Sequence, residues 1–354
     1  MNKNNLNISI FCGGSGCSGF IKYLSKFQDV NINLIVNGYD YGKSSGKIRD
    51  IIPNMLAPSD FRKNISLLIN ENNLLKEIFD YRLLNKSDYN NLINVEHIDQ
   101  KNSKLSNLIL NLPFQKFNEF TKYIKIFDDF IKNNKLVHDK DNFFLDFSIG
   151  NILFAGFFIK YKDFNITLEK ISAFAEIEHK VINVTNGDNL YLYALNSIGK
   201  LSNEVEIIEN SSLEKITDIF LLKKNLNEEE INKIEILKEE EKIKYLNNLQ
   251  VLPKLNNSLE SVLKNSDLVI FGPGTQHSSL FPSYLTNGLN EIISKIKCDK
   301  IMLTNIYFDN DLFYENSLTL IKKFYYYLSN KKNIIDKDII DFIFLNKYDE
   351  DNIN

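Results

Sequence analysis

A group of small residues near the start of the chain has the type and spacing of a phosphate-binding loop. Residues 7–12 are mostly apolar and predict a short buried strand, and Gly13, Gly14, Ser15 and Gly16 follow it directly. Together with Gly19 they match the pattern G-x-G-x-x-G between a strand and a helix. Glycines there let the backbone approach a pyrophosphate, which the helix N-terminus faces. The pattern therefore predicts a phosphate-bearing ligand.

Two other interpretations of this glycine pattern remain open. A nicotinamide dehydrogenase would also carry an acidic residue at the end of the second strand, where it holds a ribose. Asn37 stands at that position, and Asp40 lies further into the loop. The glycines could also form a tight turn without a ligand. The residues favour a phosphate ligand over hydride transfer.

A second polar segment, residues 37–49, follows the next predicted strand. It contains Asp40, Ser44, Ser45 and Arg49, and it lies at the carboxyl edge of the predicted sheet, where open α/β folds bind ligands. Asp40 could hold Mg²⁺ through oxygen, the ligand type this ion prefers. The hydroxyls could donate to phosphate, although capping of the following helix is the simpler explanation for one of them.

Arginine is scarce in this lysine-rich chain, and its positions are informative. The arginines are Arg49, Arg62 and Arg82, and a guanidinium offers a planar fork for phosphate that an ammonium cannot reproduce. Arg62 and Asn64 fall in the first turn of a predicted helix. Asp60, at the start of that helix, either meets the ligand or interacts with the helix dipole. We interpret Arg49 and Arg62 as phosphate ligands, so replacing Arg62 with Lys should weaken binding.

A third segment resembles an anion site as well. A strand predicted over 267–271 runs into Gly272, Pro273 and Gly274, and hydroxyl residues follow at Thr275, Ser278 and Ser279. Successive backbone amides in such a turn can bind an anion. His277 lies among these hydroxyls, where a hydrogen-bonded residue at the surface or at the edge of the ligand is more common than one that transfers a proton.

Alternating strands and helices must position these segments. The apolar patterns predict strands over 7–12, 31–36, 181–185, 190–195, 204–208, 267–271 and 300–305. They predict helices over 20–27, 60–69, 114–131, 148–159, from about 283, over 318–328 and over 338–345. This alternation predicts a Rossmann-like, doubly wound α/β fold with a mostly parallel sheet and helical insertions.

The chain is expected to form a single domain over 1–354 with two insertions. The first, near 70–141, is predicted to be helical. The second, near 197–256, is predicted to hold a hairpin that turns at Gly199 and a charged helix over 225–248, where Glu-rich and Lys-rich blocks alternate. Such a charge run usually marks a solvated surface helix.

Composition excludes several classes of protein. The chain has 354 residues, a net charge of −4 and 44% hydrophobic residues, values typical of a globular protein. A mildly acidic protein gives no electrostatic reason to expect nucleic acid as a partner. The apolar stretch over 147–159 is too short to cross a bilayer, so no membrane is expected. Three cysteines cannot form a disulfide framework, and a cytoplasmic location is expected.

Taken in order, these motifs resemble the CofD/YvcK family. The resemblance rests on Gly-Gly-Ser-Gly after a strand, then Asp-x-Gly-x-Ser-Ser-Gly-x-x-Arg, Pro-x-Asp-x-Arg-x-Asn and Gly-Pro-Gly-Thr-x-x-x-Ser. Two further residues match the family: Asn151 in a Ser-x-Gly-Asn segment and Asn305 after the late strand. The family joins 2-phospho-L-lactate transferases to bacterial gluconeogenesis factors. Each motif is weak alone, but their order is specific.

The resemblance implies a pocket for a nucleotide-diphosphate-linked small molecule. In the transferase branch, an acceptor hydroxyl attacks the activated donor with Mg²⁺ assistance, and Asp40 and Asp60 become the candidate catalytic residues, with Asp40 as the metal ligand. In the other branch the same pocket holds a nucleotide-sugar, and the protein regulates carbon metabolism and cell-wall growth. The family often shows two adjacent acids, whereas Tyr41 follows Asp40 here. A homodimer is also suggested by the resemblance.

Overall fold

The computed structural model describes residues 5–85, 87–94, 104–137, 140–210, 214–306, 309–332 and 339–345. The chain divides into two compact units. The first consists of Met1–Gly42 and Ile182–Asn354, and the second of Lys43–Val181. The chain therefore leaves the first unit after the second strand and re-enters it within the third.

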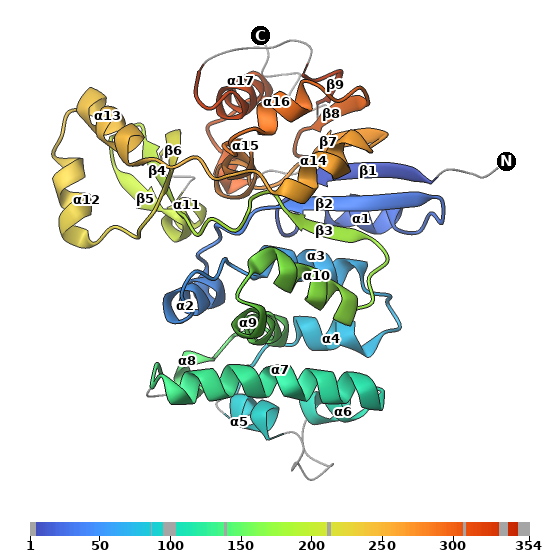
Figure 1. The fold of residues 1–354 in the computed structure, drawn as a ribbon. Helices are drawn as coiled ribbons and strands as arrows, with labels where there is room; N and C mark the ends of the chain where they lie inside the picture. The colour runs from blue at the N-terminus through green and yellow to red at the C-terminus, as the bar shows by residue number, and fades with distance from the viewer. Residues whose placement is uncertain are drawn as a thin grey trace. The chain divides into compact units, whose positions relative to one another are not determined.

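Six strands within the described residues form the main sheet of the first unit (Figure 1). Their order is β3-β2-β1-β7-β8-β9, and β1 pairs in parallel with β2 and β7, as β8 does with β7 and β9. With the strands of a separate sheet set aside, this is the order 3-2-1-4-5-6 of dinucleotide-binding domains. The predicted Rossmann-like α/β fold is confirmed. The strands are β1 (Leu6–Phe11), β2 (Val30–Val36), β3 (Lys180–Asn183), β7 (Leu268–Phe271), β8 (Asp299–Leu303) and β9 (Phe342–Phe344).

The first two strands and the helix between them form the predicted βαβ unit. Helix α1 (Ser18–Leu24) connects β1 to β2. Phe11, at the end of β1, lies opposite Ile35 of β2 and Phe271 of β7. The strand order reverses between β1 and β7, and open α/β sheets bind ligands outside the carboxyl ends of such strands.

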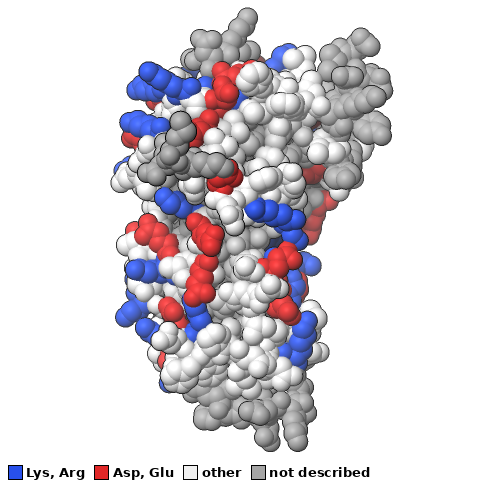
Figure 2. Space-filling model, turned by 90° about the vertical axis from the view of Figure 1, so that its right-hand side faces the viewer, with Lys and Arg blue, Asp and Glu red and all other residues white. Residues whose placement is uncertain are grey.

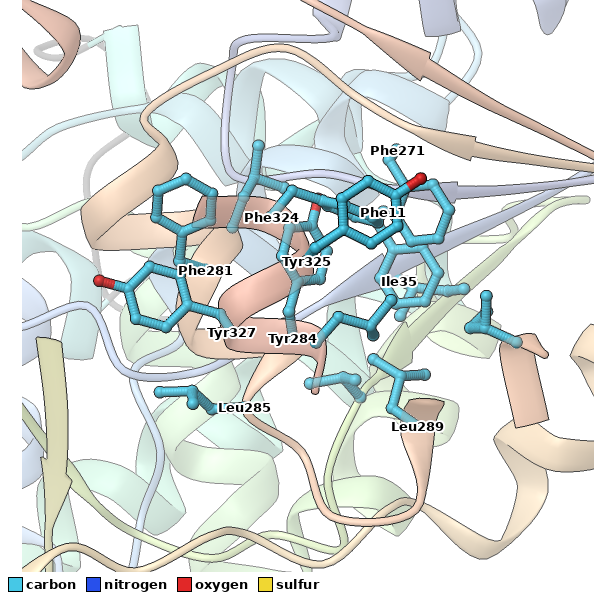
Figure 3. Close-up of a cluster of buried hydrophobic side chains, with 14 of the residues drawn as sticks. Phe11, Ile35, Phe271, Phe281, Tyr284, Leu285, Leu289, Phe324, Tyr325 and Tyr327 are labelled. Atoms are coloured by element: carbon cyan, nitrogen blue, oxygen red, sulfur yellow. The ribbon is translucent and has the colours of Figure 1, made fainter. Parts of the chain in front are cut away.

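An aromatic core packs on the ends of these central strands, and Figure 3 shows its rings. Phe11 stacks on Phe271 with ring centroids 5.0 Å apart, while Phe324 and Tyr284 meet Phe271 edge-on. Burial of each ring contributes about 2–3 kcal/mol, so the ends of β1 and β7 are firmly held. The helices that supply this layer are α14 (Asn257–Lys264), α15 (Phe281–Tyr284), α16 (Leu289–Ile293) and α17 (Ser317–Leu328).

A small antiparallel sheet, in the order β5-β4-β6, belongs to the same unit. Its strands are β4 (Tyr191–Asn196), β5 (Leu201–Asn203) and β6 (Ile216–Leu222). β4 and β5 form a hairpin around Gly199, whose φ of +78° lies in the left-handed region that favours glycine. The predicted turn at Gly199 is confirmed.

The charged segment that follows this sheet is two helices rather than the one predicted. They are α12 (Glu228–Glu235) and α13 (Glu239–Leu249), each of which begins with a run of three glutamates. Acidic side chains stabilise helix N-termini, so the second glutamate run starts a new helix. Ile234 and Leu246 from these helices bury themselves against the small sheet.

The predicted strand over 204–208 is wrong, because helix α11 (Glu204–Asn210) occupies this segment. Asn203 Oδ1 accepts from the backbone N–H of Glu206 at 3.1 Å, and Glu206 Oε2 accepts from the N–H of Asn203 at 3.0 Å. This reciprocal capping starts a helix where apolar residues alternate as in a strand.

The predicted helix over 338–345 is also wrong where the structure describes it. Phe342–Phe344 form β9, which pairs in parallel with β8, and residue 338 lies outside the described residues. Aromatic and β-branched side chains favour strands. In addition, Asp341 Oδ2 accepts a hydrogen bond from Lys300 N at 2.8 Å, which aligns β9 with β8.

The second unit is helical in its described residues. The predicted apolar helix over 148–159 is confirmed as α9, which is buried on all sides and begins after Ser148, whose Oγ accepts from Asn151 N. It lies between α7 and α10 (Figure 1). The helices are α2 (Lys43–Ile51), α3 (Ser59–Leu68), α4 (Leu74–Asp80), α5 (Asp88–Ile93), α6 (Lys104–Leu110), α7 (Phe114–Asn133), α8 (Lys140–Phe143), α9 (Ile149–Tyr161) and α10 (Phe164–Phe174).

The two predicted insertions fall in different units. The segment 70–141 lies inside the second unit, and 197–256 lies inside the first, where it contains the hairpin and the charged helices. That they are insertions relative to related proteins stays a prediction.

Two surface properties bear on partners. Among the described residues, every helix is too short or too polar to span a membrane. On the face drawn in Figure 2, acidic and basic side chains are interspersed, without a broad area of one sign.

Candidate functional site

Two glycine-containing loops meet at the carboxyl ends of β1 and β7. They are the β1 loop (residues 12–17) and the β7 loop (residues 272–275). A Cβ atom placed on Gly16 would lie 2.5 Å from Gly274 Cα and 2.7 Å from Pro273 O. Glycine at position 16 is therefore required for the contact between the loops. The sequence pattern alone did not predict this requirement.

Asn305 fixes the β7 loop from the end of β8. Its side-chain Oδ1 accepts from Gly274 N at 2.9 Å, and its Nδ2 donates to Gly274 O at 3.2 Å. Gly274 has a φ of +140°, which side-chain-bearing residues rarely adopt. Asn305, predicted as a ligand contact, thus positions the backbone of Gly274.

A cavity of about 670 Å³ opens beside the two loops, within the size range of small-molecule sites. Its walls come from residues 15–20, the β7 loop, the segment after β8 and the end of β9. Apolar side chains such as Phe20, Leu303 and Phe344 alternate with Ser15, Thr304 and Asn305. Asp309 is the charged residue among the described lining residues. The cavity thus suits a neutral group with a few hydrogen-bonding positions.

The loop after β2 is organised by carboxylates. Asp40 Oδ1 accepts from the backbone N–H of Gly42 at 3.3 Å, and Glu204 Oε2 accepts from the N–H of Tyr41 at 2.8 Å. Glu204 is buried, and sequence reasoning missed it because its segment was predicted as a strand.

A magnesium ion at this loop would depend on Asp40. The described residues contain no group of three or more His, Cys, Asp or Glu side chains arranged to hold a metal. Mg²⁺ is often bound through one or two protein carboxylates together with substrate phosphates and water. Asp40 fits such a role, with most of the coordination supplied by the ligand.

Asn37 lies where a dehydrogenase would carry its ribose-binding acid, but its side chain is used internally. Its Nδ2 donates to Ser279 O and, at 2.8 Å, to Ser283 Oγ, while its Oδ1 accepts from Tyr39 N. The amide therefore ties the β2 loop to the segment after β7, which argues against the dehydrogenase interpretation.

The hydroxyl residues after Gly274 adopt a π-helical turn over Gln276–Leu280. Thr275 Oγ1 and Ser279 Oγ lie 2.8 Å apart. Ser278 and His277 point into the protein instead: both are buried, and Ser278 Oγ has no hydrogen-bond partner among the described residues. His277 is only 1% exposed, which removes it from contact with a solvent-borne ligand in this state.

In the second unit, three helix N-termini converge on a group that we call the hydroxyl cluster: Ser44, Ser45, Ser59 and Asn151. Asn151 Nδ2 donates to Ser44 Oγ and Ser59 Oγ, each at 3.0 Å, and Ser45 Oγ is hydrogen-bonded to Ser59 Oγ. These residues lie in the first turns of α2, α3 and α9. Partial positive charge at helix N-termini favours an anion nearby.

Arg62 lies beside this cluster and is ion-paired. Its Nη1 donates to Asp80 Oδ1, and its side chain packs on Gly150 at the start of α9. Burial lowers the pKa of the Arg62 guanidinium, against the attraction of Asp80. Arg49 is buried as well.

The remaining predicted residues of the second unit have local partners. The Asp60 carboxylate lies 3.1 Å from Lys63 Nζ, and Asn64 Nδ2 donates to the backbone oxygen of Asp60 at 2.8 Å. Asp60 is in the first turn of α3, where a negative charge is stabilising. Asp60 thus interacts with the dipole of α3, which is the structural role considered for it from the sequence.

Cys17, the last residue of the β1 loop, is buried against the β7 loop. Its Sγ donates to Pro273 O at 3.3 Å, and burial raises the pKa of the thiol to about 12. In the unfolded chain the thiol ionises from about pH 8.5 upward, so folding favours the protonated form. The protonated Cys17 thiol therefore makes its full contribution to the free energy of unfolding below about pH 8.5, and this contribution is lost as the pH rises from there toward the folded pKa of about 12.

We expect Cys17→Ala to change the pH dependence of unfolding. Relative to the variant, the wild type should lose about 1.4 kcal/mol of unfolding free energy for each pH unit above the unfolded pKa. Denaturant titrations at neutral pH and at pH about 10 measure this difference, in which the titration of all other groups cancels. A constant difference across this range would contradict the buried, protonated thiol.

Comparisons with known proteins agree with this architecture. Residues 8–351 match the family model of 2-phospho-L-lactate transferase CofD. The chain is 22% identical over 300 residues to a gluconeogenesis factor of Bacillus subtilis, covering 84% of this chain and 67% of the relative. It is 22% identical over 311 residues to a gluconeogenesis factor of Halalkalibacterium halodurans, covering 86% and 68%. The chain thus spans about two thirds of the length of the curated relatives it matches.

A solved structure shares the fold. The crystal structure of a UPF0052-family protein from Bacillus halodurans superimposes with a TM-score of 0.62 at 19% identity, covering 94% of this chain and 79% of that one. The family match extends over nearly the whole chain, from β1 past β9. This chain belongs to the CofD family.

Proposed function

We propose that this protein binds a nucleotide-diphosphate-linked small molecule at the carboxyl edge of its six-stranded sheet. The observation that carries the proposal is the contact between Gly16 and Gly274 at the point where the strand order reverses. The two glycine-containing loops meet there beside a cavity of about 670 Å³, and the β1 loop offers backbone amides to a ligand. This combination suits a pyrophosphate with an attached organic group.

The charges of the described residues indicate which part of the ligand each surface would bind. The cavity walls are neutral except for Asp309, so a neutral ring or sugar fits there better than a phosphate. The β1 loop would take the diphosphate through backbone N–H groups. In the β7 loop, the N–H groups of Gly272 and Gly274 already donate to Phe11 O and Asn305 Oδ1, and Pro273 has none. Asp40 would hold Mg²⁺ against the phosphates if the ligand brings the ion.

The second unit offers its own anion-binding group. The hydroxyl cluster combines hydroxyl donors with the N-termini of three helices, and Arg62 lies beside it. Oxygen atoms of a phosphate are suitable acceptors for such a set. Asn151 is its centre, because its amide joins Ser44 to Ser59.

We infer a regulatory binding role as the first candidate function. The curated relatives described above are named gluconeogenesis factors, and Tyr41 replaces the second of two acids often present in the family. Transfer of a phosphoryl-linked group to an acceptor hydroxyl is the second candidate. It is supported by the description of the family model, with Asp40 and Asp60 as its catalytic residues.

Thermal denaturation in the presence of GDP, UDP-glucose and NAD, each with and without Mg²⁺, tests the proposal. A nucleotide present at a hundred times its dissociation constant stabilises the fold by about 2.7 kcal/mol. Stabilisation by UDP-glucose without metal supports the regulatory role. Stabilisation by GDP that requires Mg²⁺ supports transfer. A response to NAD alone would contradict both candidate functions and favour the dehydrogenase interpretation, and a response to none of the three would contradict the proposal itself.

Replacement of Arg62 by Lys tests the second unit separately. The lysine keeps the charge and can still pair with Asp80, but it lacks the planar fork, so we expect about tenfold weaker binding of the stabilising nucleotide. The matched control is Arg82→Lys, since Arg82 also pairs with an aspartate, Asp146, but is half-exposed. Isothermal titration calorimetry of both variants decides. Equal affinities in the two variants would remove Arg62 from the binding site.

A further inference from the structure

A lysine whose side chain is 14% exposed contacts the π-helical turn that follows the β7 loop. In this turn, Leu280 N donates to Thr275 O at 3.2 Å, and Ser279 N donates to the same oxygen at 3.0 Å. π-Helical turns are rare and often lie at functional sites. This one sets the relative position of Thr275 and Ser279, two of the three hydroxyl residues predicted to bind the ligand; the third, Ser278, is buried.

The lysine is Lys323 of α17, and it joins three separate segments. Its Nζ donates to Ile216 O at the start of β6 at 2.6 Å and to His277 Nε2 at 2.9 Å, and it forms an ion pair with Glu315. An ammonium has only donors, so Nε2 of His277 is the acceptor. The His277 ring meets Phe281 edge-on, with ring centroids 5.2 Å apart.

The partner of Lys323 in this ion pair, Glu315, is a buried carboxylate, and a buried carboxylate is costly without a positive charge beside it. The Glu315 side chain is only 3% exposed, and its Oε2 has no hydrogen-bond partner among the described residues. Burial acts to raise the pKa of the Glu315 carboxyl, but the charge and the hydrogen bond of Lys323, together with smaller contributions from Thr319 and His277, outweigh it and hold the pKa below its usual value. Glu315 therefore holds Lys323 in place against His277.

We propose that Lys323 is a positioning residue for the ligand site: through His277 it holds the π-helical turn, and with it the hydroxyls of Thr275 and Ser279. The same ammonium binds β6, so the small sheet and the ligand-facing turn are mechanically coupled. The identity of the ligand rests on the proposed function, whereas the coupling itself depends only on the contacts of Lys323.

Lys323→Met tests this proposal, and Lys331→Met is its matched control. Lys331 follows α17, pairs with the buried Asp218 of β6 at 2.9 Å and lies over the Phe220 ring. Each substitution removes a largely buried ammonium and leaves a buried carboxylate unpaired, so both should lower stability to a similar degree. The contacts given by Lys331 are with β6 rather than with the π-helical turn.

Two measurements separate positioning from stability. Hydrogen exchange of the full-length, ligand-free protein should show loss of amide protection in residues 275–284 for Lys323→Met and wild-type protection there for Lys331→Met. Calorimetric titration with UDP-glucose and GDP, well below the melting temperature of either variant, should give about tenfold weaker binding for Lys323→Met and less than about twofold for Lys331→Met. Lys323→Arg should restore most of the affinity.

The outcomes are distinguishable from failure of the proposed function. If the wild type binds neither nucleotide, the proposed function fails, while the exchange data still decide whether Lys323 holds the turn. Unchanged protection in Lys323→Met would overturn the inference. Equal effects of both substitutions on exchange and affinity would do so as well, because Lys323 would then be a structural residue only.

Discussion

Replacing Gly16 with alanine should destabilise the protein by about 3 kcal/mol and abolish binding of the stabilising nucleotide. The added Cβ would lie 2.5 Å from Gly274 Cα and 2.7 Å from Pro273 O. Both neighbours are backbone atoms of a loop that Asn305 holds on both sides of Gly274, so the clash is relieved only by moving the loops apart. Overpacking of this kind costs about 1–3 kcal/mol or more. Denaturant unfolding and calorimetric titration measure the two effects.

The matched control is Gly19→Ala. Gly19 lies in α1, and a Cβ there has no neighbour within 4 Å. Since alanine has a higher helix propensity than glycine, this variant should be more stable than the wild type by about 0.5–1 kcal/mol. If Gly16→Ala and Gly19→Ala behaved alike, the contact between the β1 and β7 loops would not be what requires glycine at position 16.

Replacing Gly156 with alanine should have an effect of similar size in the second unit. Gly156 lies in α9 where this helix touches α7, and an added Cβ would collide with Tyr123 O and lie 2.9 Å from the carbonyl carbon. Tyr123 also stacks on Phe157 and hydrogen-bonds to Tyr161 Oη at 3.0 Å. The helices would have to separate, so we expect a loss of about 3 kcal/mol despite the better helix propensity of alanine.

The neighbouring substitution Ala155→Gly provides the comparison. It lowers helix propensity and removes a buried methyl group, which together cost about 1–2 kcal/mol. Helix propensity alone predicts that Gly156→Ala is more stable than the wild type and that Ala155→Gly is less stable. Close packing of α9 on α7 predicts instead that Gly156→Ala is the less stable of the two variants. Thermal unfolding of both variants decides, and the reverse order would show that α7 can move away at little cost.

The positions of the glycine loops could be predicted from the sequence because each follows an apolar strand directly. Gly13 to Gly16 and Gly272 to Gly274 lie where local patterns placed them. Their mutual contact could not be predicted, since the loops are far apart in the chain and only the strand order brings them together. The requirement for glycine at position 16 thus follows from the strand order of the sheet, which places Gly16 against Gly274, rather than from the local motif.

Side-chain amides show the limit of motif reasoning most clearly. Asn305 matched a family position and was predicted to contact the ligand, yet its two polar atoms pair with Gly274. Asn37 similarly binds residues that follow β7. Most of these partners are backbone groups, which carry no sequence signature; the exception is Ser283 Oγ. The capping pair of Asn203 and Glu206 was detectable in principle, but alternation of apolar residues favoured a strand there.

The division of the chain has a consequence for how the protein folds during synthesis. The second unit is one continuous segment, Lys43–Val181, whereas the first is assembled from Met1–Gly42 and Ile182–Asn354. β1 lies between β2 and β7, so the centre of the main sheet remains incomplete until residues beyond 268 have left the ribosome. Domains generally fold as units and the N-terminal one first, but here the helical unit can complete its core before the unit that contains the N-terminus. Until then, the nascent β1 and β2 must be protected from pairing with other chains.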